Sequence, residues 1–209
     1  MLSQDAYPTR TQNNAGILAR QDPVVYEVES KSKAALDAAQ RASYEKNGFL
    51  LMPELFNPEE VDYLFNAMQG MREEFTNAGR KEVIAEPGSG EVRSIFNVHR
   101  LNDIFANLVR DPRVLNVARE ILGSEVYIHQ SRINYKPGFT GKEFYWHSDF
   151  ETWHSEDGMP AMRALSCSIL LTDNSECNGP LMLIPGSHHH YVSVSYTHLT
   201  LPTSDLVKI

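Results

Sequence analysis

The chain has little cysteine, with only Cys167 and Cys177 among its 209 residues. Two thiols are too few to build a disulfide framework, and these two do not form the close pair that is typical of a zinc site. We therefore expect both cysteines to be reduced thiols that lie in the core or in loops.

The sequence also lacks a long apolar run and a cluster of basic residues. No stretch approaches the roughly 20 apolar residues that span a membrane, and the polar segment 1–20 has no apolar stretch of the signal-peptide kind. The net charge is −8, from 27 acidic and 19 basic side chains, without a Lys/Arg cluster of the kind that binds nucleic acid. These absences predict a cytoplasmic protein that binds neither membranes nor nucleic acids.

Length and composition are those of a single globular domain. With 209 residues the chain suits one domain with one core, and 42% of its residues are hydrophobic while 22% are charged. Residues 1–30 show no hydrophobic periodicity, so we expect them to be loosely ordered. The folded domain is expected to begin at residue 31.

Three helices are predicted in the first part of the chain. The best marked begins where Asn57 can cap it, Pro58 suits the first turn and Glu60 completes a capping box. The other two are predicted at 31–47 and 111–123. The first of these is followed by a glycine that can take the left-handed conformation, and the second ends on a glycine.

Short runs rich in β-branched and aromatic residues follow the last helix and predict strands. They occupy 125–135, 165–171 and 181–184, with turn residues between them. A shorter apolar run at 49–52, closed by proline, is also expected to be a strand, and the Pro- and Gly-containing segment 81–90 is expected to be a loop. Helices first and short strands later predict an α+β domain whose β part is a sandwich or barrel.

A His-x-Asp pattern, formed by His147 and Asp149, is the candidate chemical site. In an extended segment, residues two apart project from the same face, so the imidazole and the carboxylate would aim at one point. They would form two of the three ligands of the 2-His-1-carboxylate triad, which leaves iron(II) with open positions. Aromatic neighbours that could wall this site from water are Tyr145, Trp146, Phe150 and Trp153.

The wider sequence around this pair resembles a known family. The motifs are HSDFETWHSEDGMP at 147–160, QSRINYK at 130–136 and GPLMLIPGSH at 179–188. They resemble the signature of the ectoine hydroxylases, which belong to the phytanoyl-CoA dioxygenase-like group of iron/2-oxoglutarate enzymes. The similarity runs from about residue 22 to residue 193, and it is far more specific than His-x-Asp alone. It implies a double-stranded β-helix (jelly-roll) core with flanking N-terminal helices.

The resemblance also implies a role for each matching position. His147 and Asp149 would ligate Fe(II), with 2-oxoglutarate as cosubstrate and O2 as oxidant. Lys136 would pair with the distal carboxylate of 2-oxoglutarate, with Asn134 nearby. Contacts with the substrate would come from Gln130, Thr152, Trp153 and Ser168. The implied reaction is hydroxylation of ectoine to 5-hydroxyectoine, and the resemblance suggests a homodimer.

Several of these residues also have plainer interpretations. A bare His-x-Asp pattern is more often a surface polar pair than a metal site. Lys136 sits beside Pro137 and Gly138 and could be a solvated turn residue. Gln130 on an alternating strand could be a satisfied polar residue, and Trp153 could belong to the core. Without the family resemblance these interpretations would be preferred.

Two further groups suggest chemistry that we do not assign to them. Glu151 and the pair Glu156–Asp157 could indicate paired-carboxylate catalysis, but we interpret them as loop charges. The tract His188–His190 could indicate a metal site. Consecutive side chains in an extended segment alternate faces, however, so three in a row cannot easily meet one ion. We therefore assign the tract to a turn near the site.

The chain departs from the family pattern towards its end. The family has a second metal-binding histidine well downstream of His-x-Asp and an arginine beyond it, and the chain ends at Ile209, where neither is yet expected. From Val194 the resemblance stops, so 194–209 is expected to be a non-native tail. His198 matches neither the spacing nor the strand context of the missing ligand. We therefore expect an incomplete domain over 31–193 that is inactive as it stands.

Three other functions remain open for the parent protein. One is a related phytanoyl-type hydroxylase that acts on another amino acid or small metabolite. Another is a non-redox, cupin-like binding module, which would consume no oxygen. The third is a metal-dependent hydrolase, which zinc would support where iron did not.

Overall fold

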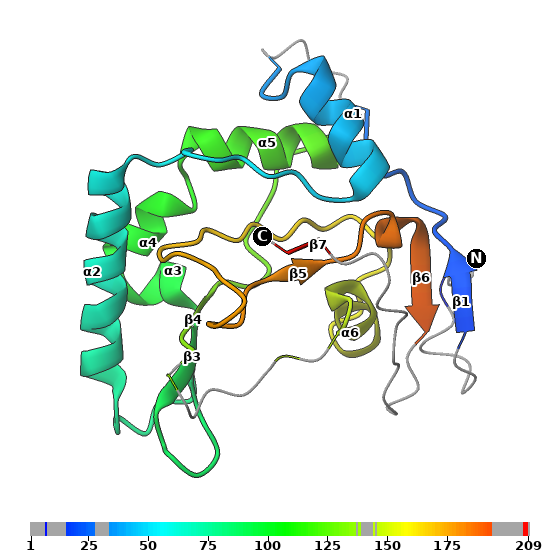
Figure 1. Ribbon diagram of the computed structural model, residues 1–209. Coiled ribbons are helices and arrows are strands. Elements are labelled where there is room, and N and C mark those ends of the chain that lie inside the picture. The colour runs from blue at the N-terminus through cyan, green and yellow to red at the C-terminus, as the bar shows by residue number, and fades with distance from the viewer. Residues whose placement is uncertain are drawn as a thin grey trace.

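The computed structural model describes residue 7, residues 16–27, 34–136, 138, 144 and 146–193, and the backbone of 207–208. In these residues, helices and short antiparallel strands form the predicted α+β arrangement (Figure 1). The helices are α1 (Ala38–Asn47), α2 (Pro58–Phe75), α3 (Val98–Leu101), α4 (Asp103–Leu108), α5 (Pro112–Leu122) and α6 (Asp149–Glu156), with a 3-10 turn η2 (Ser187–His189). The strands are β1 (Gly16–Ala19), β2 (Val83–Ala85), β3 (Val92–Phe96), β4 (Arg132–Asn134), β5 (Met182–Leu183), β6 (His190–Ser193) and β7 (Val207–Lys208).

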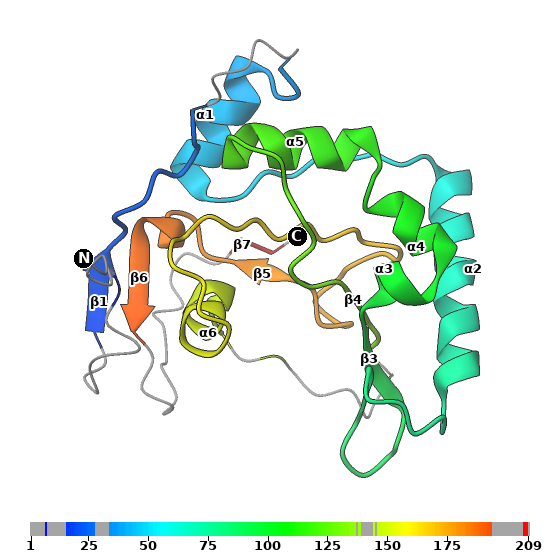
Figure 2. The same ribbon diagram turned by 180° about the vertical axis from the view of Figure 1, so that it is seen from behind.

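The longer helices frame the molecule, and α6 lies inside this frame. Helix α2 stands at one edge, α5 and α1 run along the top, and the β1–β6 pair lies at the opposite edge (Figure 1 and Figure 2). Strands β3 and β4 lie close to α3 and α4. The first residue of α6 is Asp149, one of the two predicted metal ligands, so the position of this helix determines where that ligand lies.

Local capping chemistry determines where α2 and α5 begin. The Asn57 side chain accepts a hydrogen bond from the Glu60 N–H, and the Glu60 carboxylate accepts one from the Asn57 N–H, which confirms the predicted capping box. Asp111 caps α5, and Gly123 ends it in the left-handed conformation at φ 63°. Both predicted helices are confirmed.

Helix α1 is shorter than the sequence predicted. Its N-cap is Asp37, whose carboxylate accepts the Gln40 N–H, while the Gln40 side chain accepts the Asp37 N–H. This second capping box starts the helix at Ala38, so the prediction of helix at 34–37 is wrong. Residues 31–33 lie outside the described part. The C-terminal prediction is confirmed, because Gly48 ends the helix at φ 82°.

The strands form three small antiparallel sheets, ordered β1-β6, β2-β3-β4 and β5-β7. Two strands are formed by segments that were expected to be irregular. Strand β1 lies in the supposedly loose first 30 residues, and β2 lies in the segment that was expected to be a loop. Each forms by pairing with a segment elsewhere in the chain, β6 and β3 respectively, which local composition does not reveal.

Other predicted strands are shorter than expected or absent. Of 125–135, only Arg132–Asn134 is a strand, and of 181–184 only Met182–Leu183. The runs 49–52 and 165–171 are not strands in the described structure. β-branched and aromatic residues favour strands only where a partner backbone is available, and these two segments have no ladder partner among the described residues.

Two groups of buried side chains hold the elements together. The larger joins α2, α3 and α4 to β3, β4 and the residue that follows β4, and consists of Leu64, Met71, Phe75, Val92, Ile95, Val98, Phe105, Ile133 and Tyr135. The smaller joins α6 to β6 and the N-terminal segment, and consists of Tyr7, Phe150, Met162 and Tyr191. The position of α6 therefore depends on the smaller group.

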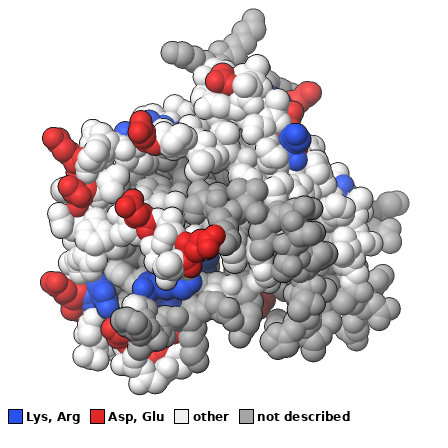
Figure 3. Space-filling model, viewed as in Figure 1, with Lys and Arg blue, Asp and Glu red and all other residues white. Residues whose placement is uncertain are grey.

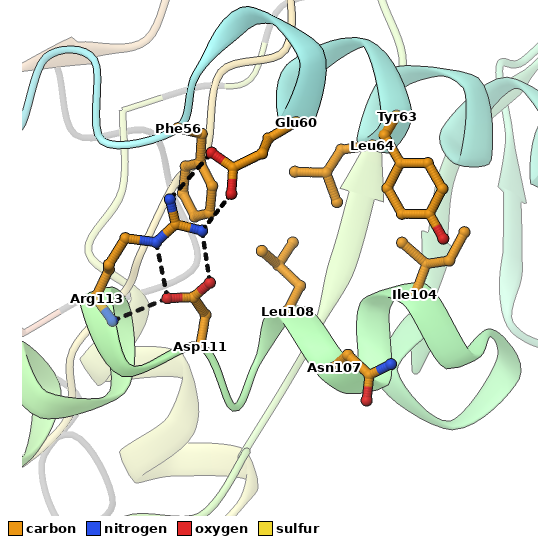
Figure 4. A pocket seen from close by; sticks show the side chains of 9 residues that line it. All are labelled: Phe56, Glu60, Tyr63, Leu64, Ile104, Asn107, Leu108, Asp111 and Arg113. Atoms are coloured by element: carbon orange, nitrogen blue, oxygen red, sulfur yellow. Dashed lines mark hydrogen bonds and ion pairs between the residues drawn. The ribbon is translucent and has the colours of Figure 1, made fainter.

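Arg113 connects the starts of α2 and α5. Its guanidinium forms ion pairs with Glu60 and Asp111, each with a shortest contact of 2.7 Å, and donates to the Leu55 carbonyl at 2.9 Å (Figure 4). It also lies 4.3 Å from the centre of the Phe56 ring. The guanidinium lowers the pKa of both carboxyls. All five N–H donors of Arg113 are used, so the surrounding shallow pocket has no free guanidinium donor for an anion.

Replacing Arg113 by lysine is expected to lower the melting temperature by a few degrees. An ammonium has three donors and cannot reproduce the planar, bidentate bonds to two carboxylates. Thermal unfolding followed by circular dichroism measures the change. Arg41→Lys is the matched control, because Arg41 forms a single exposed i,i+4 pair with Glu45. Equal melting temperatures for the two variants would contradict this role for Arg113.

Buried and half-buried tyrosines predict a loss of stability at alkaline pH. Burial raises the pKa of Tyr7 to about 12, and burial also raises the pKa values of Tyr26, Tyr44 and Tyr135. Unfolded tyrosines ionise near pH 10.0, so the unfolded chain releases these protons first. Their contribution to stability is therefore complete below pH 10 and is lost as the pH rises towards about 12.

Urea unfolding at several pH values between about 8 and 12 measures this loss. Tyr135 donates its hydroxyl to the Met68 carbonyl at 2.6 Å, and we expect Tyr135→Phe to make the alkaline decline shallower. Tyr63 is 60% exposed, so Tyr63→Phe should leave the decline unchanged. An identical decline in both variants would show that the buried hydroxyl does not cause it.

Oppositely charged side chains lie side by side on part of the surface. In Figure 3, basic side chains lie beside acidic ones on the face shown, and Arg72 and Arg93 pair with Glu91 and Glu86. Cys167 and Cys177 are free thiols in loop segments, as predicted. Among the described helices, none is long and apolar enough to cross a membrane.

Candidate functional site

His147 and Asp149 converge at the start of α6. His147 precedes the helix, Ser148 is its extended N-cap at φ −109° and ψ 135°, and Asp149 is its first residue. The prediction of one continuous extended segment is therefore wrong. The two side chains nevertheless meet, with His147 Nε2 3.5 Å from Asp149 Oδ1. One extended residue followed by a helical turn brings positions i and i+2 to the same side here.

The surroundings of Asp149 keep its carboxyl group ionised. The hydrogen bond from His147 lowers its pKa, as do the hydrogen bond from Ser166 and the charge of Arg132, against the opposing effect of burial. Ser166 Oγ donates to Asp149 Oδ2 at 3.1 Å. An ionised carboxylate is the form that binds a metal ion. Each oxygen of Asp149 therefore has a defined neighbour, His147 on one side and Ser166 on the other.

Ser166 and Arg132 were not among the residues predicted for the site. Ser166 lies in the loop after α6, and nothing in its local sequence indicates a contact with Asp149. Arg132 lies on β4, inside the motif QSRINYK that carried part of the family resemblance, so a signal was available. Its charge contributes to the lowered pKa of Asp149.

Helix α6 has one face towards the site and another in the core. Asp149, Thr152 and Trp153 are spaced i, i+3 and i+4, so they share a face. Thr152 is exposed and Trp153 is half-buried. The indole of Trp153 meets the ring of His129 edge to face, with 5.1 Å between the ring centres. Two of the predicted substrate residues therefore lie one turn from Asp149.

The interpretation of Glu151 as a loop charge is wrong. Glu151 lies on the core face of α6 and is 2% exposed. Its Oε1 atom accepts the backbone N–H of Val192, on β6, at 2.9 Å. Glu151 therefore helps to attach α6 to β6. The other two acidic residues, Glu156 and Asp157, are exposed at the C-terminal end of the helix.

The remaining predicted site residues lie on β4 and in loops. Asn134 accepts a hydrogen bond from Ser94 Oγ at 2.8 Å, and Lys136 Nζ donates to the Gly179 carbonyl at 3.4 Å. Gln130 is exposed just before β4, and Ser168 is exposed after α6. Hydrogen bonds and ion pairs of the described residues do not connect Lys136 or Ser168 with the His147–Asp149 pair.

Two residues of the histidine tract form a turn, as predicted, and the third, His190, begins β6. His188 and His189 belong to η2, with ring centres 3.9 Å apart, and His188 Nε2 lies 3.0 Å from the Glu45 carbonyl oxygen. In the part of the chain that the structure describes, no group of three His, Cys, Asp or Glu residues is arranged to hold a metal ion. His198 lies outside that part.

The His147–Asp149 pair fits two adjacent positions on one divalent metal ion. Two ligand atoms at about 2.1 Å from an ion and at right angles to one another lie about 3 Å apart. The observed separation of 3.5 Å differs from this by an amount that a small side-chain rotation removes. A neutral imidazole and a carboxylate also belong to the ligand set of non-haem iron(II) sites.

The sequence and fold define the class of protein. The family model described as "Phytanoyl-CoA dioxygenase (PhyH)" matches residues 44–204. The chain therefore belongs to the phytanoyl-CoA dioxygenase family. The candidate metal ligands, the β4 motif and the turn at η2 all lie within the matched range.

More specific similarity is to ectoine dioxygenases. The chain is 62% identical over 191 residues to the ectoine dioxygenase of Bordetella bronchiseptica, which covers 91% of this chain and 62% of that protein. It is 51% identical to the ectoine dioxygenase of Stutzerimonas stutzeri, over 91% of this chain and 63% of that protein. The chain thus spans a little more than three fifths of the length of these curated relatives.

Solved structures of EctD from S. alaskensis are similar in fold. The structure with bound Fe has a TM-score of 0.85 and 48% sequence identity, over 91% of this chain and 67% of that chain. The structure with 2-oxoglutarate and 5-hydroxyectoine has a TM-score of 0.84 with the same identity.

Proposed function

We propose that this chain carries the metal-binding part of a non-haem iron(II)- and 2-oxoglutarate-dependent dioxygenase that hydroxylates ectoine to 5-hydroxyectoine. The observation that carries the proposal is the convergence of His147 and Asp149, with Ser166 on the second carboxylate oxygen. The identity of 62% to an ectoine dioxygenase supports the substrate. The similar structures that hold Fe, 2-oxoglutarate and 5-hydroxyectoine support the cofactor and the product.

Each proposed role follows from the chemistry of the side chain. His147 and Asp149 would hold Fe(II), which, when bound, supplies the activation of O2 that is coupled to 2-oxoglutarate decarboxylation. Ser166 orients the Asp149 carboxylate, as a hydrogen bond to a metal-ligating group typically does. Lys136 would offer a point charge to the distal carboxylate of 2-oxoglutarate, next to the Asn134 amide. These residues bind and orient, while the cofactors supply the reactive chemistry.

The proposed substrate site lies on the exposed face of α6. The indole of Trp153 would hold the delocalised cation of ectoine by cation–π attraction. Hydrogen bonds from the hydroxyl of Thr152, the amide of Gln130 and the hydroxyl of Ser168 would orient the substrate. Thr152 and Trp153 share a helix face with Asp149, which would place the substrate close to the metal.

The finer features of the fold and assembly are proposals as well. The TM-score of 0.85 to EctD supports a double-stranded β-helix core, to which the small antiparallel sheets would belong. We place the family domain at 31–193, and β1 and Tyr7 of the preceding segment pack against it through β6 and the smaller core group. A non-native tail at 194–209 is also a proposal, against which stand the family match to residue 204 and the pairing of β7 with β5. Sequencing of the source DNA across residue 193 tests it. A homodimer in the cytoplasm completes the proposal, with sedimentation and cell fractionation as tests.

Product analysis tests the proposed function directly. The chain is incubated with Fe(II), 2-oxoglutarate, oxygen and ectoine, alone and as a fusion to the remaining part of the Bordetella bronchiseptica relative. We expect 5-hydroxyectoine and succinate in equal amounts from the fusion, and neither from its His147→Ala variant. A folded, iron-loaded fusion that consumes 2-oxoglutarate with another small metabolite but not with ectoine would overturn the substrate. One that makes no succinate with any substrate would overturn the enzyme class.

A further inference from the structure

Trp153 belongs to a closed circuit of contacts on the surface of α6. Its backbone carbonyl accepts the N–H of Asp157 at 3.1 Å. The Asp157 carboxylate accepts a hydrogen bond from His129 Nε2 at 3.1 Å. The ring of His129 then returns to the Trp153 indole, at 5.1 Å between centres and 71° between planes. His129 and Asp157 thus contact each other, and between them they contact the backbone carbonyl and the indole of Trp153.

The circuit joins two distant parts of the chain. His129 lies in the segment before β4, next to Gln130, while Asp157 is the C-cap of α6. A carboxylate can only accept, so the proton on His129 is placed on Nε2. The edge-to-face arrangement of the two rings is a favoured geometry for aromatic pairs. Both the position and the tilt of the His129 ring are therefore set by its neighbours.

We propose that His129 and Asp157 are positioning residues for Trp153, which fix the orientation of its indole on the face of α6 that carries Asp149. A half-buried tryptophan without such a neighbour can exchange between side-chain rotamers. A flat ring attracts a cation through its face and not through its edge, so orientation determines whether the indole can bind one. The ligand of the indole is taken from the proposed function, on which this proposal rests. The orientation of the indole is argued from the contacts of His129 alone.

The orientation of the indole is measurable without any ligand. The chain has two tryptophans, Trp146 and Trp153, so Trp146→Phe leaves Trp153 as the only one. In this background we compare His129→Ala, His129→Phe and Asp157→Ala by near-UV circular dichroism and time-resolved fluorescence anisotropy. We expect His129→Ala to show a weaker tryptophan signal and faster indole motion. His129→Phe, which keeps an aromatic edge, should restore much of the order, and Asp157→Ala should lose part of it.

Binding of ectoine provides a second measurement on the same variants. We expect His129→Ala to weaken ectoine binding about fivefold, the loss expected when one aromatic contact no longer orients the ring. Asp62→Asn is the matched control for the charge change, because Asp62 is exposed on α2. Thermal unfolding identifies any variant that fails to fold. If His129→Ala does not fold, the comparison of His129→Phe with Asp157→Ala tests the positioning role instead.

The outcomes separate this inference from the proposed function. Unchanged indole spectra in His129→Ala would overturn the positioning role, whether or not ectoine binds. Unchanged spectra in Asp157→Ala alone would remove Asp157 from the proposal, and spectra of His129→Phe as disordered as those of His129→Ala would overturn the edge contact. If the unsubstituted chain holds its indole rigidly but does not bind ectoine, the result counts against the proposed function and not against the positioning role.

Discussion

Replacing His147 by alanine is expected to weaken Fe(II) binding by more than about 100-fold, because even residues that only orient metal ligands change affinity by 10- to 100-fold. Asp149→Ala should have an equal effect, since the two side chains would occupy adjacent positions on the ion. Isothermal titration calorimetry with Fe(II) under argon measures both affinities.

Two further variants, one with a smaller expected loss of Fe(II) affinity and one with none, serve as comparisons. Ser166→Ala removes only the hydrogen bond to Asp149 Oδ2, so we expect a loss of about tenfold. His189→Ala removes an exposed imidazole of the histidine turn and should leave the affinity unchanged. If His147→Ala bound Fe(II) as tightly as the parent chain while His189→Ala did not, the metal site would have been assigned to the wrong histidine.

Replacing His154 by alanine is expected to lower the free energy of unfolding by about 3 kcal/mol, as large-to-small changes in a core do. His154 is fully buried on the core face of α6, and its ring nitrogens lie 2.7 Å from the Met159 carbonyl oxygen and 3.1 Å from the Tyr7 carbonyl oxygen. The Phe150 ring stacks on it at 5.4 Å. Alanine would leave a cavity and remove the imidazole, whose single N–H can donate to only one of these two carbonyls at a time.

Urea unfolding measures this destabilisation. His190→Ala is the control, since the His190 side chain is exposed on β6. We also expect His154→Ala to reduce Fe(II) affinity. Asp149 is the first residue of α6, and the core face of α6 packs against Tyr7 and Tyr191, so loosening this packing would shift Asp149. A loss of less than about 1 kcal/mol, the range of ordinary substitutions, would contradict the role of His154 in fixing α6.

Features determined by local chemistry could be predicted from the sequence. The capping box of Asn57 and Glu60, the cap at Asp111 and the closing glycines Gly48 and Gly123 depend on residues a few positions apart. Strand β1 could not be predicted, because it forms only where β6 offers a partner more than 160 residues further on. The same reason explains why apolar runs such as 165–171 remained without a strand.

The candidate site was predictable in its residues more than in its geometry. The motif identified His147 and Asp149, but the extended segment expected there is interrupted by α6 at Asp149. This helix turns Glu151 into the core, which a loop would not have done. The contact from Ser166 depends on how the loop after α6 returns to the head of that helix, and no local pattern encodes that path.

X-ray absorption at the iron edge, recorded on the chain loaded with Fe(II) under argon, tests the convergence of the two ligands most directly. We predict scattering from one imidazole and from a carboxylate oxygen at about 2.1 Å, with the imidazole contribution absent in His147→Ala. A first shell of water oxygens alone, or an imidazole contribution that persists in His147→Ala, would contradict the account.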